Sequence, residues 1–293
     1  MPAFKVSVVS LGYASYDLER SLLSRIDAEL VLAPRDCLTE EEVIAAARDA
    51  DAVLVREAPI GSRVIRALTR CRAIVRYGVG VDNIDLEAAK MRHIYVANVP
   101  GYGTEEVSDH AAALLLACIR RLLQRDACLR RGILESDIQA PVYRTTGKIL
   151  GLLGYGQIGR AFHRKWKGFL PGRVLVFDPE VAPEVIRDNG AEPATLEELF
   201  SCSDYLSLHA PLTEKTRHIV DADRLNCMKP TAILVNTARG GLIDEDALAA
   251  ALAAGRIAGA GLDVFEKEPP PRRPPVAFPA ERRPERPCRV VFP

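Results

Sequence analysis

The chain has 293 residues, enough for two domains of ordinary size, with 39 basic and 39 acidic side chains. Such a balance excludes a basic field that would draw the whole molecule to nucleic acid or to an anionic membrane. Seven cysteines occur without CxxC or zinc-like spacing, which predicts free thiols in a reducing compartment and no metal site. No apolar run approaches the ~20 residues of a membrane span. We therefore expect a cytoplasmic protein that contacts no membrane.

The first 98 residues repeat short apolar runs and helical patterns. The runs predict strands at 5–10, 29–33, 52–56, 73–77 and 95–98. The segment "TEEEVIAAARD" between two of them predicts a helix that Thr39 caps, with three glutamates at its positive start. Strands that alternate with helices predict a parallel sheet covered on both faces.

A long helix is predicted over residues 103–132, as a bridge between domains or a subunit contact. A second series of strand–helix units follows from Gly147, with the apolar runs "KILGLLG", "VLVFD", "YLSLHAP", "AILVNTA" and "AGAGLDVF". The fold class is thus α/β with two domains, 1–98 and 99–269, followed by a tail at 270–293. This tail is rich in proline and arginine, which disfavours a packed core, although "CRVVFP" could form one short strand.

The strongest chemical signal is "GKILGLLGYGQIGRAF", in which glycines 154, 156 and 159 follow a strand and open a helix. Gly154 permits a tight turn, Gly156 lets the backbone approach a pyrophosphate, and Gly159 allows close packing of helix and strand. Asp178 ends the next strand, where an acid can bond both ribose hydroxyls and repel a 2′-phosphate. No basic residue follows it closely, so the pattern predicts NAD; the alternative is a purely structural turn beside a surface aspartate.

Three further stretches carry chemistry. "RYGVGVDNIDL" places the amides of Val79 and Gly80 after a strand, where they can hold an anion. "LVNTARGGLIDEDAL" presents Arg239 at the carboxyl end of a strand, the edge where open α/β sheets bind ligands. "GLDVFEKEP" presents Asp263 and Glu268 after the next strand.

Together with the glycine motif, these stretches resemble the D-isomer-specific 2-hydroxyacid dehydrogenases over residues 5–269. "RYGVGVDNID", "NVPGYGTEEVSDHAAALLL" and "VNTARGGLIDEDAL" are most similar to the branch of the C-terminal-binding-protein corepressors. The resemblance implies a flavodoxin-like substrate domain and a Rossmann domain for NAD. It also implies a homodimer that interconverts a small D-2-hydroxy acid and a 2-oxo acid by hydride transfer.

The resemblance assigns a role to each matching residue. Arg239 would clamp the carboxylate and carbonyl oxygen of the substrate, and Glu268 would orient a histidine that shuttles the hydroxyl proton. Val79 and Gly80 would bind the substrate carboxylate, with Arg56 as an auxiliary ligand. Three simpler readings stay open: Arg239 as a helix cap, Glu268 as a loop acid, and Arg56 in a surface ion pair. The positions that match NAD contacts of the family are Gly154, Gly156, Gln157, Ile158, Gly159, Asp178, Ala210, Pro211, Thr237, Ala238, Arg239 and Asp263.

The family places its catalytic histidine some twenty residues beyond the glutamate, whereas every histidine of this chain precedes Glu268. They are His93, His110, His163, His209 and His218. We expect His110 to serve packing or a hydrogen bond and His209 to lie near NAD, and none of the five to replace the missing base.

Two interpretations of the tail are open. Either "CRVVFP" is the last strand of the family's sheet and the chain stops before the histidine, or the text after about Pro270 is out-of-frame translation. The second is favoured because the proline density suits no fold. In both, the family's closing helix is absent, and we expect weakened NAD binding and slow turnover.

The sequence leaves competing functions. The leading one is a compromised NAD-dependent dehydrogenase; the alternative is a non-catalytic, NAD(H)-responsive binding protein of the corepressor type. A nucleic-acid-binding role for the tail ranks low, because it has no lysine and two glutamates dilute its arginines. Glyoxylate, hydroxypyruvate, pyruvate and larger 2-oxo acids all remain compatible as substrates.

Overall fold

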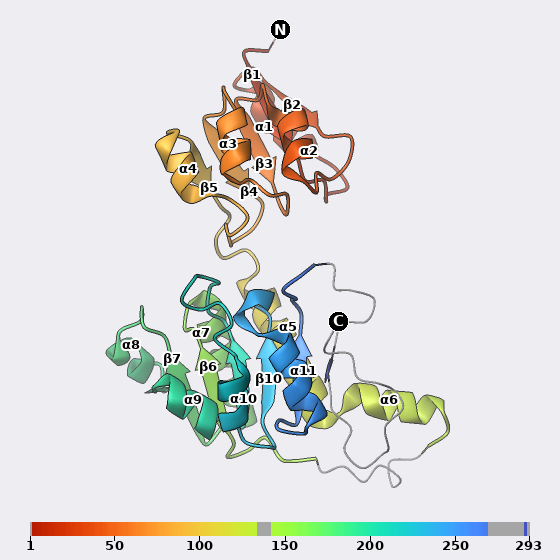
Figure 1. Cartoon of the computed structure of the whole chain (residues 1–293), viewed down its shortest axis with the longest axis vertical. Coiled ribbons are helices and arrows are strands. Elements are labelled where there is room, and N and C mark those ends of the chain that lie inside the picture. The colour runs from red at the N-terminus through yellow and green to blue at the C-terminus, as the bar shows by residue number, and fades with distance from the viewer. Residues whose placement is uncertain (1, 134–141, 269–289, 292–293) are drawn as a thin grey trace. The chain divides into compact units, whose positions relative to one another are not determined.

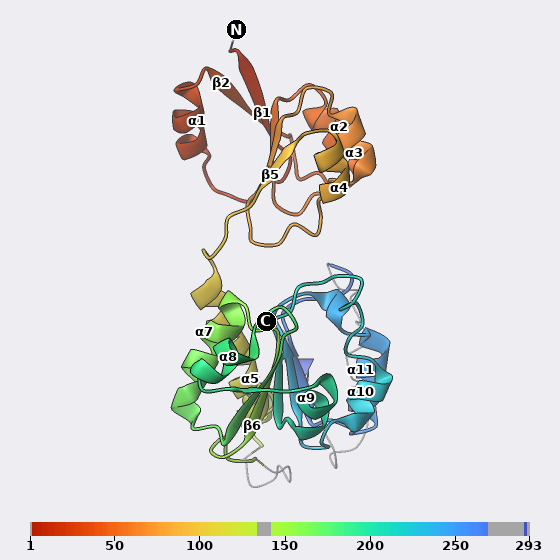
Figure 2. The same cartoon turned by 90° about the vertical axis from the view of Figure 1, so that its left-hand side faces the viewer.

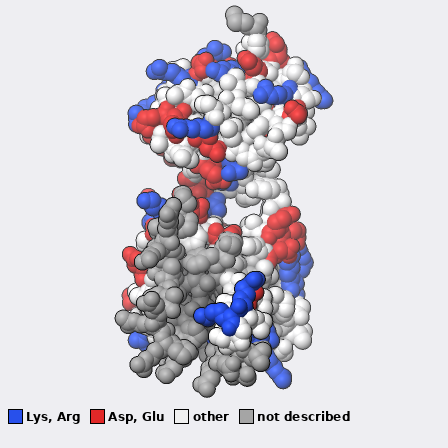
Figure 3. All heavy atoms as spheres, turned by 90° about the vertical axis from the view of Figure 1, so that its right-hand side faces the viewer, with Lys and Arg blue, Asp and Glu red and all other residues white. Residues whose placement is uncertain are grey.

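The computed structural model describes residues 2–133, 142–268 and 290–291 (Figure 1). The chain divides into two compact units, Met1–Tyr102 and Gly103–Pro293. The division lies four residues beyond the boundary expected from the sequence, at the start of the long helical segment. No described helix is long and apolar enough to cross a bilayer. On the face drawn in Figure 3, basic and acidic side chains lie interspersed over the described surface.

The first unit is a parallel five-stranded sheet in the order β2-β1-β3-β4-β5. Its strands are β1 (Phe4–Val8), β2 (Ala28–Leu32), β3 (Ala52–Val55), β4 (Ala73–Arg76) and β5 (Tyr95–Ala97). Its helices are α1 (Asp17–Ser24), α2 (Glu40–Ala47), α3 (Ser62–Ala67) and α4 (Leu86–Met91). All five predicted strands are therefore present, with no end shifted by more than two residues, and the order is that of flavodoxin-like folds.

Local sequence explains where α2 begins. The hydroxyl of Thr39 accepts a hydrogen bond from the Glu42 amide, and the Glu42 carboxylate accepts one from the Thr39 amide, both at 3.3 Å. This reciprocal pair satisfies two amides that the first helical turn would leave open. The predicted cap at Thr39 is confirmed.

The two faces of this sheet are covered unequally. Helices α2, α3 and α4 lie on one face, where Val53 and Ile74 are fully buried, and α1 lies on the other (Figure 2). On the α1 side, Leu54 and Val75 are only half-buried, and α1 itself buries none of its residues. Within the described residues of this unit, the predicted cover is therefore present on both faces but is thinner on the α1 side.

The second unit is a parallel seven-stranded sheet in the order β12-β11-β10-β9-β6-β7-β8. Its strands are β6 (Ile149–Leu153), β7 (Arg173–Phe177), β8 (Glu192–Pro193), β9 (Tyr205–Leu208), β10 (Ile233–Asn236), β11 (Gly259–Leu262) and β12 (Val290–Val291). Its helices are α5 (Thr104–Arg120), α6 (Leu122–Arg130), α7 (Gln157–Trp166), α8 (Pro183–Asp188), α9 (Leu196–Cys202), α10 (Ala222–Cys227) and α11 (Glu245–Ala253), with 3₁₀ turns at Lys167–Phe169 and Gly240–Leu242. The strand order reverses on either side of β6, which makes the β6/β9 edge a topological switch point of the Rossmann type.

The single long helix expected over 103–132 is wrong. Arg121 adopts the left-handed conformation, with φ of 56° and ψ of 38°, and separates α5 from α6. The turn buries the Arg121 side chain, whereas α6 extends away from the sheet without a buried residue (Figure 1). A tertiary contact has overridden a continuous helical pattern.

The end of the chain contributes one described strand. Val290 and Val291 pair in parallel with Ala260 and Gly261 of β11. The short strand expected in "CRVVFP" is therefore confirmed at its two valines. Residues 269–289 lie outside the described part, as do the two predictions about the origin of the tail.

Candidate functional site

The glycine-rich turn lies between β6 and α7. Gly154 has φ of +94°, and a Cβ atom there would lie 2.6 Å from the amide nitrogen of Ala210. A Cβ on Gly159 would lie 2.5 Å from the carbonyl oxygen of Gly154. Next to Gly156, in contrast, no described atom lies within 4 Å. The chain's own packing thus requires glycine at 154 and 159, while Gly156 leaves open space for a ligand.

Helix α7 begins at this turn. Gly156 precedes its first residue, and no side chain caps the helix. The first amides of α7, including those of Gln157 and Ile158, therefore present unsatisfied donors and positive dipole to an anion. The turn and the helix start together fit a pyrophosphate.

Asp178 follows β7 and is bound to the glycine turn itself. Its Oδ2 accepts a hydrogen bond of 2.6 Å from the Tyr155 amide, and its Oδ1 accepts one of 2.9 Å from the Glu180 amide. The carboxylate is thereby fixed beside the turn, where it can accept from ribose hydroxyls. An anion at this place repels a 2′-phosphate, which favours NAD over NADP.

The loop after β10 is organised by a residue that the sequence analysis did not single out. Asn236 accepts a 3.0 Å bond from the Ala238 amide and donates a 2.8 Å bond to the Arg239 carbonyl. Arg239 donates to the Ala238 carbonyl at 2.7 Å. The buried hydroxyl of Thr237 has no hydrogen-bond partner in the described part of the chain, so it is available to a ligand. An Asn directly before a turn was the available signal for this role.

Asp263 lies on the neighbouring loop, where its amide donates to the Asn236 carbonyl at 3.0 Å. His110 of α5 approaches it, with Nε2 3.3 Å from Asp263 Oδ1. The expected packing or hydrogen-bonding role of His110 is thus a contact with a proposed cofactor residue. This contact connects α5 to the carboxyl edge of the sheet.

His209 directly follows β9 and supports the glycine turn, because its backbone would collide with a Cβ on Gly154. Its Nε2 lies 2.9 Å from the Ser207 hydroxyl, and burial lowers its pKa to about 4. The ring is therefore neutral at pH 7. Ala210 follows directly and also lies against Gly154, whereas Pro211 is exposed and its carbonyl accepts a 2.7 Å bond from the Thr216 hydroxyl.

Glu268 is exposed, and its Oε1 accepts a 3.0 Å hydrogen bond from the Phe265 amide. The acid that does contact a histidine is Glu266, whose Oε1 lies 2.9 Å from His218 Nε2 and 2.7 Å from an Arg217 nitrogen. Among the described residues, no histidine contact of Glu268 is present.

The two remaining histidines are His163 in the second unit and His93 in the first. His163 of α7 is buried, and its Nδ1 lies 2.7 Å from the Tyr155 hydroxyl. Its pKa falls to about 4 through burial first and the positive charge of Lys167 second. His93 is exposed in the turn after α4.

The predicted substrate ligands lie in the other unit. The exposed Val79 and the half-buried Gly80 follow β4, and the Val79 carbonyl accepts a 2.7 Å bond from Asn98. Arg56 follows β3, and its Nε lies 3.3 Å from the Glu57 carboxylate. The surface ion pair that the sequence left open for Arg56 is therefore present. The site predicted from the sequence thus divides between the first unit and the second.

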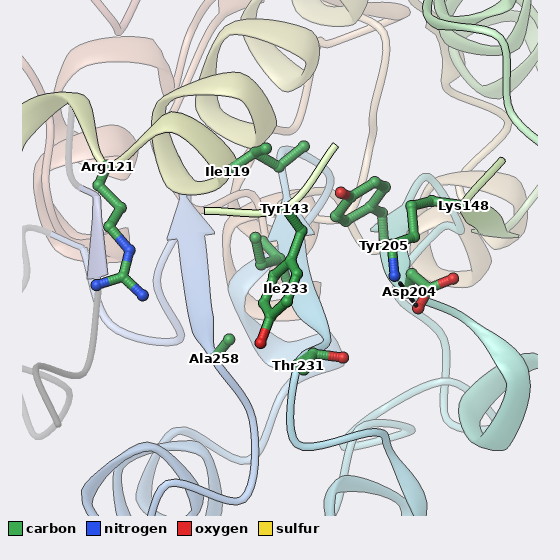
Figure 4. A pocket seen from close by; sticks show the side chains of 9 residues that line it. All are labelled: Ile119, Arg121, Tyr143, Lys148, Asp204, Tyr205, Thr231, Ile233 and Ala258. Atoms are coloured by element: carbon green, nitrogen blue, oxygen red, sulfur yellow. Dashed lines mark ion pairs between the residues drawn. The ribbon is translucent and has the colours of Figure 1, made fainter. Parts of the chain in front are cut away.

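A separate pocket opens at the amino edge of the second sheet, away from the glycine turn (Figure 4). Lys148, Asp204, Thr231 and Ala258 each precede a strand and line it, together with Ile119, Arg121, Tyr143, Tyr205 and Ile233. Asp204 is held by Lys148 at 3.6 Å and accepts a 2.8 Å bond from the Ile149 amide. Ligands of open α/β sheets bind at the opposite, carboxyl edge.

Comparison with known proteins agrees with this geometry. Residues 112–281 match the model of the D-isomer specific 2-hydroxyacid dehydrogenase, NAD binding domain. A glyoxylate reductase of Korarchaeum cryptofilum is 42% identical over 237 residues, which are 80% of this chain and 71% of that protein. A D-3-phosphoglycerate dehydrogenase of Methanocaldococcus jannaschii is 41% identical over 239 residues, 81% of this chain and 45% of that protein.

A solved structure extends the likeness to both units. The D-lactate dehydrogenase of Aquifex aeolicus, complexed with NAD and lactic acid, superposes with a TM-score of 0.81 at 29% identity. The match covers 90% of this chain and 78% of that one.

Proposed function

Because the chain belongs to the D-isomer specific 2-hydroxyacid dehydrogenase family, an NAD-dependent family, we propose that it interconverts a D-2-hydroxy acid and a 2-oxo acid. The observation that carries the proposal is the glycine turn with open space beside Gly156, next to the fixed carboxylate of Asp178. Bound NAD would supply the hydride acceptor, and NADH the donor. The chain's own residues would bind the substrate, orient it towards the cofactor and exchange a proton with it.

Arg239 is the proposed clamp for the substrate. Its guanidinium extends from the loop after β10, whose shape Asn236 fixes through two hydrogen bonds. A planar guanidinium can donate two parallel hydrogen bonds, one to the carboxylate and one to the carbonyl oxygen. Val79 and Gly80 would bind the same carboxylate through their amides. The positive guanidinium beside the carbonyl oxygen would stabilise the negative charge that develops on this oxygen as hydride arrives.

The proposed reaction needs a group that exchanges the hydroxyl proton of the substrate. No histidine follows His218 in residues 219–293. Exposed Glu268 contacts the Phe265 amide in place of an imidazole. Absence of a positioned acid or base typically lowers the rate ~10²–10⁴-fold. For residues 1–293 we propose cofactor binding with slow turnover.

A homodimer is proposed through the α5–α6 region. Leu122, Leu123 and Leu129 of α6 are 52%, 50% and 63% exposed, so one helix presents three large apolar side chains that a partner could cover. A second copy would cover them. Leu129→Ser should then shift the sedimentation coefficient towards the monomer while the far-UV circular dichroism stays native, and an unchanged coefficient would remove this support.

The experiment that tests the function is hydride transfer. The full chain, at micromolar concentration, is incubated with NADH and glyoxylate, and with NAD and either enantiomer of lactate. Slow reduction of glyoxylate and exclusive use of D-lactate are expected, and both should fall with Arg239→Lys, which loses the planar fork. Binding of NADH without any transfer would instead favour the non-catalytic, NAD(H)-responsive alternative.

A further inference from the structure

Two arginines lie together at the carboxyl edge of the first sheet. Arg56 directly follows β3 and Arg76 ends β4, in paired strands whose register aligns Val55 with Arg76. The Nε of Arg76 donates a 3.1 Å hydrogen bond to the Arg56 carbonyl. The Arg56 guanidinium lies where a Cβ on Gly12 would stand, and the Arg76 guanidinium lies where a Cβ on Gly78 would stand. The backbone carbonyl of Arg56 thus holds the Arg76 guanidinium, and both guanidinium groups lie against glycine backbone.

This edge is where the fold binds ligands. In the strand order 2-1-3-4-5, the switch point lies between β1 and β3, and the loops after those strands bound it. Gly12 lies on the first of these loops and Arg56 on the second. Gly78, which Arg76 covers, is followed immediately by Val79 and Gly80. The arginine pair thus adjoins the amides proposed to bind the substrate carboxylate.

Glu57 lies between the two arginines. Its Oε1 is 3.3 Å from the Arg56 Nε, and its Oε2 is 3.7 Å from an Arg76 nitrogen. The Glu57 amide is held by the buried hydroxyl of Ser10 at 3.3 Å, which fixes the backbone of this residue at the sheet edge. The Glu57 side chain is 67% exposed, so solvent and ligands reach the pair.

We propose that Glu57 determines substrate charge: its carboxylate occupies the anion site of Arg56 and Arg76, so that 2-oxo acids with one negative charge are accepted and those with two are rejected. This inference rests on the proposed function. Two guanidinium groups and one carboxylate leave one net positive charge, and the Glu57 carboxylate would repel a second substrate anion at this site. Sequence similarity leaves the question open, because a glyoxylate reductase and a D-3-phosphoglycerate dehydrogenase are almost equally identical to this chain.

The test compares two ligands that differ in one charged group. Oxaloacetate has a carboxylate where 2-oxobutyrate has a methyl group. Each is titrated calorimetrically into the full chain saturated with NAD, which cannot pass hydride to an oxo acid. The variants are Glu57→Gln and the double variant Glu57→Gln/Arg76→Gln. Glu41→Gln is the matched control, because Glu41 is similarly exposed, at 61%, and pairs with Arg63 rather than with Arg56 or Arg76.

The native chain should bind 2-oxobutyrate more tightly than oxaloacetate. Glu57→Gln should raise the affinity for oxaloacetate about tenfold, because one close charge repulsion is removed. The affinity for 2-oxobutyrate should stay within about twofold of the native value. Glu41→Gln should change neither affinity. The double variant should lose the increased affinity for oxaloacetate, because Arg76 is absent. Equal effects of Glu57→Gln and Glu41→Gln on oxaloacetate would overturn the proposal.

If no variant binds either oxo acid, the proposed function fails. Titration with inorganic phosphate then tests the role of Glu57 independently of that function. Phosphate is titrated into the native chain, Glu57→Gln and the double variant, with the arginine Nε–H resonances as the readout. Saturable shifts that appear in Glu57→Gln and vanish in the double variant would support the neutralising role of Glu57 alone. The same phosphate-induced shifts in the native chain and Glu57→Gln, or an unchanged shift of Arg56 in the double variant, would refute it.

Discussion

Two alanine substitutions in one turn should separate folding from cofactor binding. In Gly154→Ala, the new Cβ would meet the Ala210 amide at 2.6 Å, in a backbone with φ of +94°. Such a conformation costs an L-residue about 1–3 kcal/mol, and overpacking adds about 1–3 kcal/mol. The second unit should therefore lose roughly 2–6 kcal/mol of its free energy of unfolding. This is a large part of the ~5–15 kcal/mol that stabilises a typical domain.

Gly156→Ala has the opposite profile. Its φ is −70°, which alanine adopts readily, and no described atom lies within 4 Å of the new methyl group. The free energy of unfolding should stay within about 0.5 kcal/mol of the native value. The methyl group would, however, enter the space proposed for the pyrophosphate. NADH affinity should fall by about tenfold or more, because the backbone can no longer approach the phosphates.

The assay is urea unfolding of each variant, followed by NADH titration. Trp166 is the single tryptophan and is buried in the second unit, so its fluorescence reports both unfolding of that unit and energy transfer to bound NADH. Native NADH affinity in Gly156→Ala would refute the assignment of the turn to a dinucleotide. Equal destabilisation by the two substitutions would refute the distinction between structural and ligand-facing glycines.

Three other predictions concern charge, pH and capping. Asp178→Ser should lower the ratio of NADH to NADPH affinity about tenfold in parallel titrations, because the anion that repels a 2′-phosphate is gone; an unchanged ratio would contradict the role of Asp178. Burial holds the pKa of His163 and of His209 at about 4, below about 6.5 in the unfolded chain. The unfolded chain therefore binds more protons between those pH values, and each histidine should cost about 1–2 kcal/mol of stability between pH 7 and pH 5. His163→Gln should flatten the pH dependence measured by urea unfolding, and an equally steep profile would argue against a buried neutral ring. Thr39→Ala and Thr195→Ala each remove a capping box, the first from α2 and the second from α9. Each should cost about 1 kcal/mol, and hydrogen exchange should show the loss only in the unit that holds the substituted residue.

Features encoded within a few neighbouring residues could be predicted from the sequence. The turn at Gly154 and the cap at Thr39 depend on local backbone requirements, and both are present. The strands were predictable because buried parallel strands read as short apolar runs. Arg121 was not predictable, since its left-handed conformation depends on burying its own side chain. Local propensity favoured a continuous helix there.

Contacts between distant segments escaped the sequence analysis. Arg76 and Glu57 come together only because β3 pairs with β4, and the motif "RYGVG" directed attention to its glycines. His110 was expected in a helix, but its approach to Asp263 depends on how α5 packs beneath the sheet. Glu268 was assigned by resemblance, and its described contact is the Phe265 amide.

The most direct test of the central claim is a calorimetric titration of the full chain with NADH and with NADPH. The proposed site predicts saturable binding of NADH at one site per chain, and at least tenfold weaker binding of NADPH because of Asp178. Absence of saturable NADH binding would contradict the assignment of the glycine turn and the helix start of α7 to a dinucleotide. A preference for NADPH would contradict the role of Asp178 alone.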